Sequence, residues 1–378
     1  MDWEFFERPT AGDGYAAAQS RIIIEGDHSI SPFEIFVREV LQNSLDASRE
    51  GQKVRVRFRI RTISLPGPRG LFLDAIGWSK LKERVAAANR VRKNRLEPPE
   101  FGDPAILEKD PLRVLEIVES GTIGLVGPEA VLNENDERRL PNETPKAYIA
   151  LTRDDARREK QGLGSGGTYG LGKAVLWAAS EIQTVVFFSR LSVPHSGTVH
   201  RAAGQARLGS HFLNNKPFRG LCYGGDRRDG WCRPVRDEAA RTLATRLGAD
   251  TRPSDGDSGT TIIIPFWAAP EGDQPGILDH ALIARYAARY FWPAIVDDSL
   301  EVTATSSDGN DVSAADLLSH YEPFIQLYKR TNSGVPGLKD VAPEKIDFTV
   351  PKGPPPRTEG PTKTFARVAM TFVAEAEV

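Results

Sequence analysis

The regular alternation of residues 54–61 limits most strongly how this chain can fold. Apolar side chains occupy every even position of this segment, and arginines occupy every odd one. Because successive side chains of a β-strand point to opposite faces, a period of two predicts a strand with one buried face and one arginine face. The fold must therefore contain a sheet with at least one covered face.

A helix is predicted just before this strand. Ser31 is a suitable N-cap, Pro32 takes the first helical position, and Glu34 completes a capping box three residues after the cap. The helix is expected to run from about Pro32 to Arg49 and to end near Gly51, because glycine is common just after helices.

Similar patterns place the remaining elements. We expect further strands over residues 111–121, 184–190, 260–267, 299–305 and 364–376, and further helices over residues 78–95, 174–183, 236–247, 278–295 and 314–330. The Pro/Gly-rich stretch before residue 78 and the charged segment 152–167 are interpreted as loops. The first thirty residues contain aromatic side chains without a clean period and are interpreted as an arm.

Composition excludes several classes of protein. The chain has 378 residues, enough for two or three domains, and its 49 basic and 51 acidic side chains nearly cancel. No apolar run approaches the roughly 18 residues of a membrane helix, and the N-terminus does not have the pattern of a secretory signal. Cys222 and Cys232 lack zinc-site spacing, so both are expected to be free thiols. We therefore expect a cytoplasmic protein without a membrane partner.

Three polar residues share one face of the predicted first helix. Glu39, Asn43 and Asp46 are four and three positions apart, which places them within about 60° of one another around the axis. An amide oxygen suits Mg²⁺, and a carboxylate can accept a proton from water. A solvated helix flank is the alternative interpretation of the same pattern.

Residues 164–173 form a glycine-rich segment before a predicted helix. Glycines let backbone amides approach phosphate oxygens closely, and the N-terminus of a helix attracts anions. Residues 167–173 also fit the G-x-x-x-x-G-K pattern of a P-loop. In a P-loop, however, a hydroxyl residue would stand at Ala174, and an apolar strand would precede the segment.

Taken in order, these segments resemble the motifs of the GHKL ATPases, the group that includes gyrase B, the mismatch-repair protein MutL, the ninety-kilodalton heat-shock chaperone, the MORC proteins and the sensor histidine kinases. The first helix is similar to the family pattern E-x-x-x-N-x-x-D-A, with matches at Glu39, Asn43, Asp46 and Ala47. The resemblance covers roughly the first 270 residues, with long insertions between the motifs.

Three later motifs carry the rest of the resemblance. The end of the strand over 111–121 resembles D-x-G-x-G, but Glu119 replaces the aspartate, Ile123 stands at the second glycine position, and Gly124 follows one residue late. The glycine-rich segment and a Gly-Thr pair before the strand over 260–267 are also similar to family motifs, with matches at Gly167, Gly170, Gly172, Gly259 and Thr260.

The resemblance assigns a role to each matching residue. It implies that Glu39 is the general base for water, that Asn43 binds Mg²⁺, and that Asp46 lines the nucleotide pocket. Glu119 is expected to accept a hydrogen bond from adenine, and Thr260 to hold that acid and a water. The remaining expected contacts to ATP are Gly121, Gly124, Gly167, Gly170, Gly172 and Lys173.

The same resemblance implies an α+β fold. We expect a two-layer α/β sandwich of the Bergerat type, in which helices cover one face of a mixed sheet and ATP lies between the layers. The expected organisation is an N-terminal arm over 1–30, an ATP-binding domain over 31–270 with insertions at about 62–110 and 191–258, and a smaller α/β transducer-like module over 271–378.

Two functional classes remain open from the sequence. In the first, ATP closes the lid and drives homodimerisation, with the arm of residues 3–15 exchanged across the dimer, and hydrolysis drives work on DNA or a partner protein. In the second, the ATP-bound dimer is a slow switch that recruits other proteins. Hydrolysis is expected rather than phosphotransfer, because Glu39 suits water activation and no histidine-bearing dimerisation helix precedes it. The arginine stripe of residues 55–61 is consistent either with phosphate contacts or with a solvated strand face.

Overall fold

The computed structural model describes residues 1–8, 30–95, 101–130, 146–153, 172–228, 230–249, 257–270 and 278–332. The chain divides into two compact units, Met1–Asp316 and Leu317–Val378. The first unit contains the whole described sheet. At the junction of the units, the predicted helix over 314–330 is formed as a 3₁₀-helix, η2 (Ala314–Tyr321), followed by α11 (Glu322–Asn332). The strand predicted over 364–376 lies outside the described residues.

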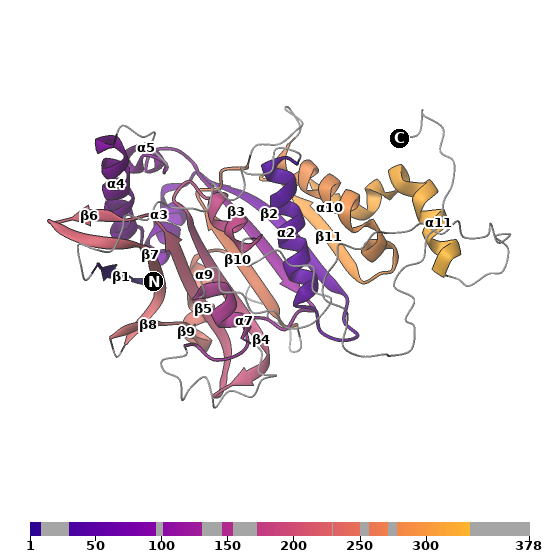
Figure 1. The fold of residues 1–378 in the computed structure, drawn as a ribbon, viewed down its shortest axis with the longest axis horizontal. Coiled ribbons are helices and arrows are strands. Elements are labelled where there is room, and N and C mark those ends of the chain that lie inside the picture. The colour runs from indigo at the N-terminus through magenta and orange to yellow at the C-terminus, as the bar shows by residue number, and fades with distance from the viewer. Residues whose placement is uncertain are drawn as a thin grey trace, which may run out of the picture. The chain divides into compact units, whose positions relative to one another are not determined.

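Within the described residues, twelve strands form one mixed sheet (Figure 1). The order is β1-β7-β5-β4-β10-β3-β2-β11-β12, while β6 and β8 pair with β7, and β9 pairs with β5. The bounds are β1 Asp2–Glu7, β2 Val54–Ile63, β3 Leu112–Ser120, β4 Thr184–His195, β5 Thr198–Arg207, β6 His211–Leu213, β7 Lys216–Arg228, β8 Trp231–Arg233, β9 Val235–Arg236, β10 Gly259–Pro265, β11 Leu300–Thr305 and β12 Asp311–Ser313. The pair β2 and β11 is parallel, and the neighbours β3 and β10 are antiparallel.

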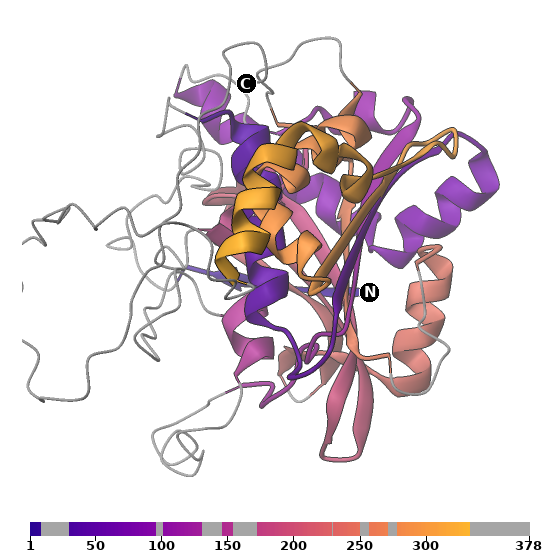
Figure 2. The ribbon, with the colours of Figure 1, turned by 90° about the vertical axis from the view of Figure 1, so that its right-hand side faces the viewer.

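Helices lie on both faces of this sheet, as Figure 2 shows from the side. Their bounds are α2 Pro32–Asp46, α3 Pro66–Ala75, α4 Trp78–Asn94, α5 Pro104–Leu107, α7 Ala147–Thr152, η1 Gly172–Ala174, α8 Val175–Ala178, α9 Asp237–Arg246 and α10 Asp279–Val296. No helix among the described residues combines the length and apolar character that a membrane span requires.

Helix α2 begins where the sequence predicts. Ser31 has an extended backbone, and its hydroxyl accepts a hydrogen bond from the Glu34 amide at 3.2 Å. Apolar side chains spaced by three and four positions then form one buried face, which includes Phe33, Val37 and Leu41. Phe33 packs edge-on against Tyr286 of α10, so α2 and α10 share the first layer of helices.

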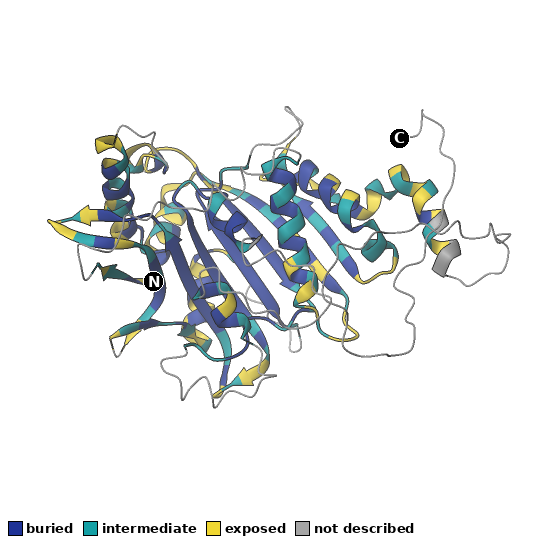
Figure 3. Ribbon diagram, viewed as in Figure 1, coloured by how far each residue is buried: buried dark blue, intermediate teal, exposed yellow. Residues whose placement is uncertain are grey.

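The alternation within β3 separates the two faces. Leu112 and Val114, two of its even-numbered residues, belong to a core that also contains residues of α3, α4 and α9. Its odd-numbered residues face α2, because Glu119 accepts a hydrogen bond from Ser44 on that helix. Figure 3 shows the central strands buried along their length, as expected for a sheet covered on both faces.

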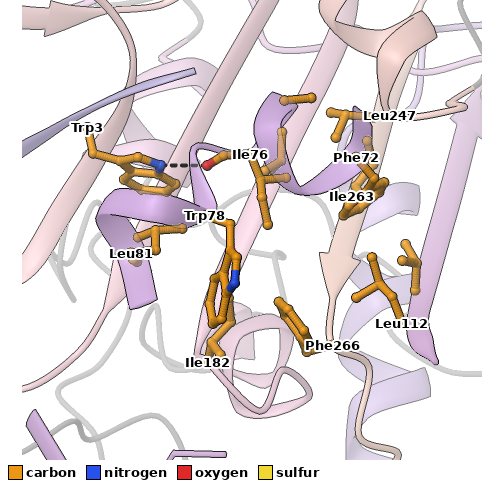
Figure 4. Packing of buried hydrophobic residues seen from close by; sticks show 14 of the residues in the cluster. Trp3, Phe72, Ile76, Trp78, Leu81, Leu112, Ile182, Leu247, Ile263 and Phe266 are labelled. Atoms are coloured by element: carbon orange, nitrogen blue, oxygen red, sulfur yellow. Dashed lines mark hydrogen bonds between the residues drawn. The ribbon is translucent and has the colours of Figure 1, made fainter. Parts of the chain in front are cut away.

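The second layer is built from segments far apart in the sequence. Helices α3 and α4 come from the expected insertion at 62–110, and α9 comes from the one at 191–258. Their apolar side chains pack together over the sheet, and Figure 4 shows Phe72 and Leu247 in this cluster. An ion pair between Arg246 and Asp74 also joins α9 to α3. The two expected insertions therefore form one continuous layer.

Several expectations change at this level. Helices were expected on one face of the sheet but cover both. The apolar side chains of α3, α4 and α9 pack on the apolar residues of the second face. The Pro/Gly-rich stretch after β2 forms helix α3, since Pro66 stands in the first turn, where proline is tolerated. Strand β11, expected in a C-terminal module, pairs with β2 and lies in the first compact unit.

The start of the expected arm is part of this chain's own sheet. Residues 2–7 form β1, which pairs with β7, and the Trp3 side chain is only 2% exposed. Its indole nitrogen donates a hydrogen bond of 2.7 Å to the Ile76 carbonyl (Figure 4). Trp3 is therefore a core residue of its own chain. Exchange across a dimer would require it to pack against the partner chain instead. Residues 9–15 of the arm lie outside the described residues.

Replacing Trp3 with alanine should strongly destabilise the protein. The substitution removes a buried indole and its hydrogen bond, so the free energy of unfolding should fall by about 3–5 kcal/mol. Chemical denaturation measures this loss, and it should not depend on protein concentration. Leu65→Ala is the control, because Leu65 is 68% exposed and its loss should cost less than about 0.5 kcal/mol. Equal losses for the two variants would contradict the core position of Trp3.

Candidate functional site

The C-terminal end of α2 is joined to the turn that follows β3. The Arg49 amide donates to the Gly121 carbonyl at 2.9 Å, and the Ile123 amide donates to the Ala47 carbonyl at 2.8 Å. Ser48 and Thr122 stand opposite each other between these two bonds. This connection, called the α2–β3 seam below, brings the predicted residues of the first helix next to those of the strand end.

Near the seam, the Glu119 side chain is hydrogen-bonded to α2. The Ser44 hydroxyl donates to Glu119 Oε1 at 2.7 Å, and both residues are buried. Strand β10 lies beside β3 with Thr261 opposite Val118, so Thr260 is placed next to Glu119 on the face that α2 covers. Two residues predicted to act together, Glu119 and Thr260, are therefore neighbours in the structure.

The turn after β3 depends on its glycines. Gly121 has a φ of 75°, and a Cβ there would lie 2.1 Å from the Lys53 carbonyl oxygen. Gly124 has a φ of 69°, and its Cβ would lie 2.5 Å from the Arg190 carbonyl oxygen. At both positions the positive φ favours glycine, and a neighbouring carbonyl leaves no room for a side chain. The displaced Gly124 is thus a required feature of this turn.

The residues on the polar face of α2 differ in exposure. Asn43 and Asp46 are exposed, whereas the Glu39 side chain retains 14% of its accessible surface. Glu39 lies 3.4 Å from Arg38 Nη2, and Asp46 accepts a hydrogen bond from Gln42 at 2.9 Å. A largely shielded carboxylate and an accessible amide therefore lie on one helix face.

The described end of the glycine-rich segment lies against α2. Gly172 and Lys173 belong to η1, which contacts α2 together with α8. Lys173 Nζ donates to the Ala150 carbonyl at 2.6 Å and so connects η1 to α7. Gly167 and Gly170, and most of the predicted charged loop, lie outside the described residues.

The arrangement therefore gathers residues from four separated segments of the chain. Their groups are a carboxylate suited to accept a proton, an exposed amide oxygen, a lysine ammonium, and a buried acid beside a threonine hydroxyl. Among the described residues, no three His, Cys, Asp or Glu side chains come together as a metal-binding group. A groove of about 500 Å³ lies elsewhere, between α5 and the residues after β10, and contains none of the predicted site residues.

The hydroxyl groups that organise this region carry no local signal in the sequence. Ser189 Oγ accepts from the Leu125 amide at 2.8 Å and donates to the Gly259 carbonyl at 2.9 Å. Ser258 donates to the Thr122 carbonyl at 2.6 Å. Serine and threonine occur throughout the chain, and only the strand register shows which of them meet at the seam.

The arginine stripe of β2 is largely engaged within the protein. Arg59 Nε donates to Glu116 Oε2 at 2.5 Å, and the Glu116 side chain is fully buried. Arg61 donates to the Leu247 and Gly248 carbonyls at the C-terminal end of α9, and Arg55 pairs with Glu301 at 3.6 Å. Arg59 and Arg61 therefore serve to connect β2 to β3 and α9, which removes the basis for assigning them to phosphate contacts.

A scan against protein-family models finds no match to this chain, and a search of curated proteins finds none either. The functional interpretation therefore depends on the motifs and on the geometry described above.

Gly121→Ala should destabilise the protein more than the replacement of a left-handed glycine usually does. An L-residue in this conformation costs about 1–2 kcal/mol, and the contact with the Lys53 carbonyl adds to that cost. Gly51→Ala is the matched control, because Gly51 has a φ of 69° but nothing lies within 4 Å of its Cβ position. Thermal or chemical unfolding should show the larger loss for Gly121→Ala, and equal losses would contradict the close approach.

Arg59→Gln should destabilise the fold, whereas Arg55→Gln should have little effect. Losing the Arg59 charge weakens the pairing of a buried carboxylate, at a cost of about 2–3 kcal/mol. Arg55 is 58% exposed, and its pair is long, so its loss should cost less than about 1 kcal/mol. Urea denaturation of both variants measures the difference, and a neutral Arg59→Gln would show that the stripe is not structural.

Proposed function

We propose that this chain binds Mg²⁺ and ATP and hydrolyses the γ-phosphate as a GHKL-type ATPase with a Bergerat-type fold. The observation that carries the proposal is the α2–β3 seam, which brings the motif-bearing helix to the motif-bearing strand end, with Thr260 alongside. Motifs that matched by chance would have no physical reason to meet at one place. Their meeting in space is independent of the sequence pattern that suggested them.

In this proposal, each part of the site has a separate task. Glu39 accepts the proton of the attacking water, for which a shielded carboxylate near solvent is suited. Glu119 and Thr260 bind the base edge of the nucleotide, and Lys173 adds a positive charge beside the phosphates. Gly172, at the start of η1, is positioned to let the backbone approach a phosphate oxygen.

The exposed Asn43 amide fits the coordination of Mg²⁺. This ion keeps several waters and takes only one or two protein ligands in nucleotide sites, so a cluster of carboxylates is not required. When bound, the ion neutralises phosphate charge during transfer. Asn43 presents its oxygen donor one helical turn from Glu39, on the face that the attacking water would share.

The wider role proposed is ATP-driven closure and homodimerisation that act on a partner, with DNA as one candidate. The engaged Arg59 and Arg61 make the β2 stripe a poor DNA surface. Trp3 is likewise committed to the core of its own chain. If a DNA surface or an exchanged arm exists, other residues must supply it.

Glu39→Ala should bind ATP but hydrolyse it at least about 100-fold more slowly than wild type, because a general base is lost. Asn43→Ala should lose the Mg²⁺-dependent part of ATP affinity. Calorimetry with and without EDTA measures binding, and phosphate release measures turnover. Glu83→Ala, an exposed glutamate on α4, is the control and should behave as wild type.

Three outcomes of this experiment separate the hypotheses. Wild-type turnover in Glu39→Ala would refute its role as the base. Absence of ATP binding by the wild-type protein would refute the proposed function itself. Tight binding and ATP-dependent dimerisation with negligible turnover by the wild type would favour the nucleotide-gated switch.

A further inference from the structure

The Thr122 side chain is a buried polar group without a partner. Thr122 is fully inaccessible to solvent, and its hydroxyl makes no hydrogen bond with any residue that the structure describes. Leaving a hydroxyl unsatisfied in the interior costs more than a typical hydrogen bond gains, so buried polar groups are nearly always paired. This group therefore requires an explanation other than packing.

Its surroundings identify where the missing partner belongs. Thr122 lies between Gly121 and Ile123, whose backbone groups are both bonded to the end of α2. Its own carbonyl accepts from Ser258, two residues before Thr260, and it follows Glu119 by three positions. The residue is thus joined through the backbone to both residues assigned to the base of the nucleotide.

The backbone on both sides of Thr122 is held in place. Gly121 is fixed on one side by its positive φ and by the closeness of the Lys53 carbonyl, and Ile123 is fixed by its bonds to Ala47 and Ser192. The Ser258 hydroxyl already donates to the Thr122 carbonyl. The position is therefore constrained from three directions while the side chain is left unpaired.

We propose that the Thr122 hydroxyl is a specificity-determining contact to the nucleobase of the bound nucleotide, made directly or through one enclosed water. This inference rests on the proposed function and adds a residue to the base-binding corner of Glu119 and Thr260. A threonine hydroxyl both donates and accepts, so it complements a ring nitrogen or a water that such a nitrogen binds. Glu119 and Thr260 are buried as Thr122 is, so a base or an enclosed water that reaches this corner supplies the hydroxyl with a partner shielded from solvent.

Thr122→Val tests this contact, because it replaces the hydroxyl with a methyl of similar size. Loss of one hydrogen bond should weaken the binding of ATP, ADP and adenosine by about three- to tenfold each. Inorganic triphosphate, which has no base, should bind as it does to wild type. The melting temperature of the nucleotide-free variant should stay unchanged or rise, since an unsatisfied group has been removed.

Three further variants guard against misinterpretation. Thr122→Ser keeps the hydroxyl and should retain wild-type affinity, whereas Thr122→Ala should lose as much affinity as Thr122→Val although it is less stable. Thr184→Val is the matched control, because that buried hydroxyl already donates to the Ile182 carbonyl at 3.0 Å. Its substitution should lower stability and leave nucleotide affinity unchanged.

The outcomes separate this inference from the function on which it rests. If wild type binds adenosine and Thr122→Val binds it equally well, the base contact is refuted and the ATPase proposal stands. An equal loss of affinity for inorganic triphosphate would place Thr122 at the phosphates and also refute the base contact. If wild type binds neither adenosine nor ATP, the proposed function fails first.

Discussion

The α2–β3 seam is the interaction on which the rest of the site depends. Its two backbone hydrogen bonds fix both the rotation and the axial position of α2 relative to the sheet. A shift of one residue along α2 would turn its faces by about 100° and take Ser44 away from Glu119. The same shift would turn the face that Glu39 and Asn43 share away from its present direction. The side chains of the site are therefore positioned by main-chain bonds, which substitution of those side chains leaves in place.

The second layer of helices makes this position rigid. Because apolar groups cover both faces of the central strands, the sheet is held from the side opposite α2 as well. The buried carboxylate of Glu116 lies in that interior, and Arg59 provides its closest counter-charge. Burying an ion is unfavourable unless it is paired, so this pairing fixes the register between β2 and β3. That register in turn sets the position of Glu119 near the end of β3.

Local patterns predicted the elements well, and pairing between distant segments explains most of what they missed. The capping box at Ser31 and the alternation from Val54 are local signals, and the structure confirms both elements. Strand β1 was missed because it is stabilised by contacts of Trp3 with residues more than seventy positions away, which no local pattern reveals. Helix α3 was missed because Pro66 and its neighbouring glycines indicate a loop unless the apolar surface beneath them is known. The meeting of Glu119 and Thr260 follows from strand order, which no local period contains.

The positions at which the chain differs from the GHKL motifs it resembles lie at the end of β3 and in the turn that follows, and they are consistent with one another. Glutamate at position 119 extends its carboxylate by one methylene, and Ser44 holds that carboxylate against α2. Gly124 stands one residue late, yet its φ of 69° and the closeness of the Arg190 carbonyl show that the longer turn still needs a glycine there. On α2, by contrast, the spacing of Glu39, Asn43 and Asp46 is unchanged. If the chain binds a nucleotide, the end that handles water and Mg²⁺ is retained, and the end that recognises the base has been rebuilt. Thr122 lies in the same turn, so under the proposed function its unpaired hydroxyl belongs to the end that recognises the base.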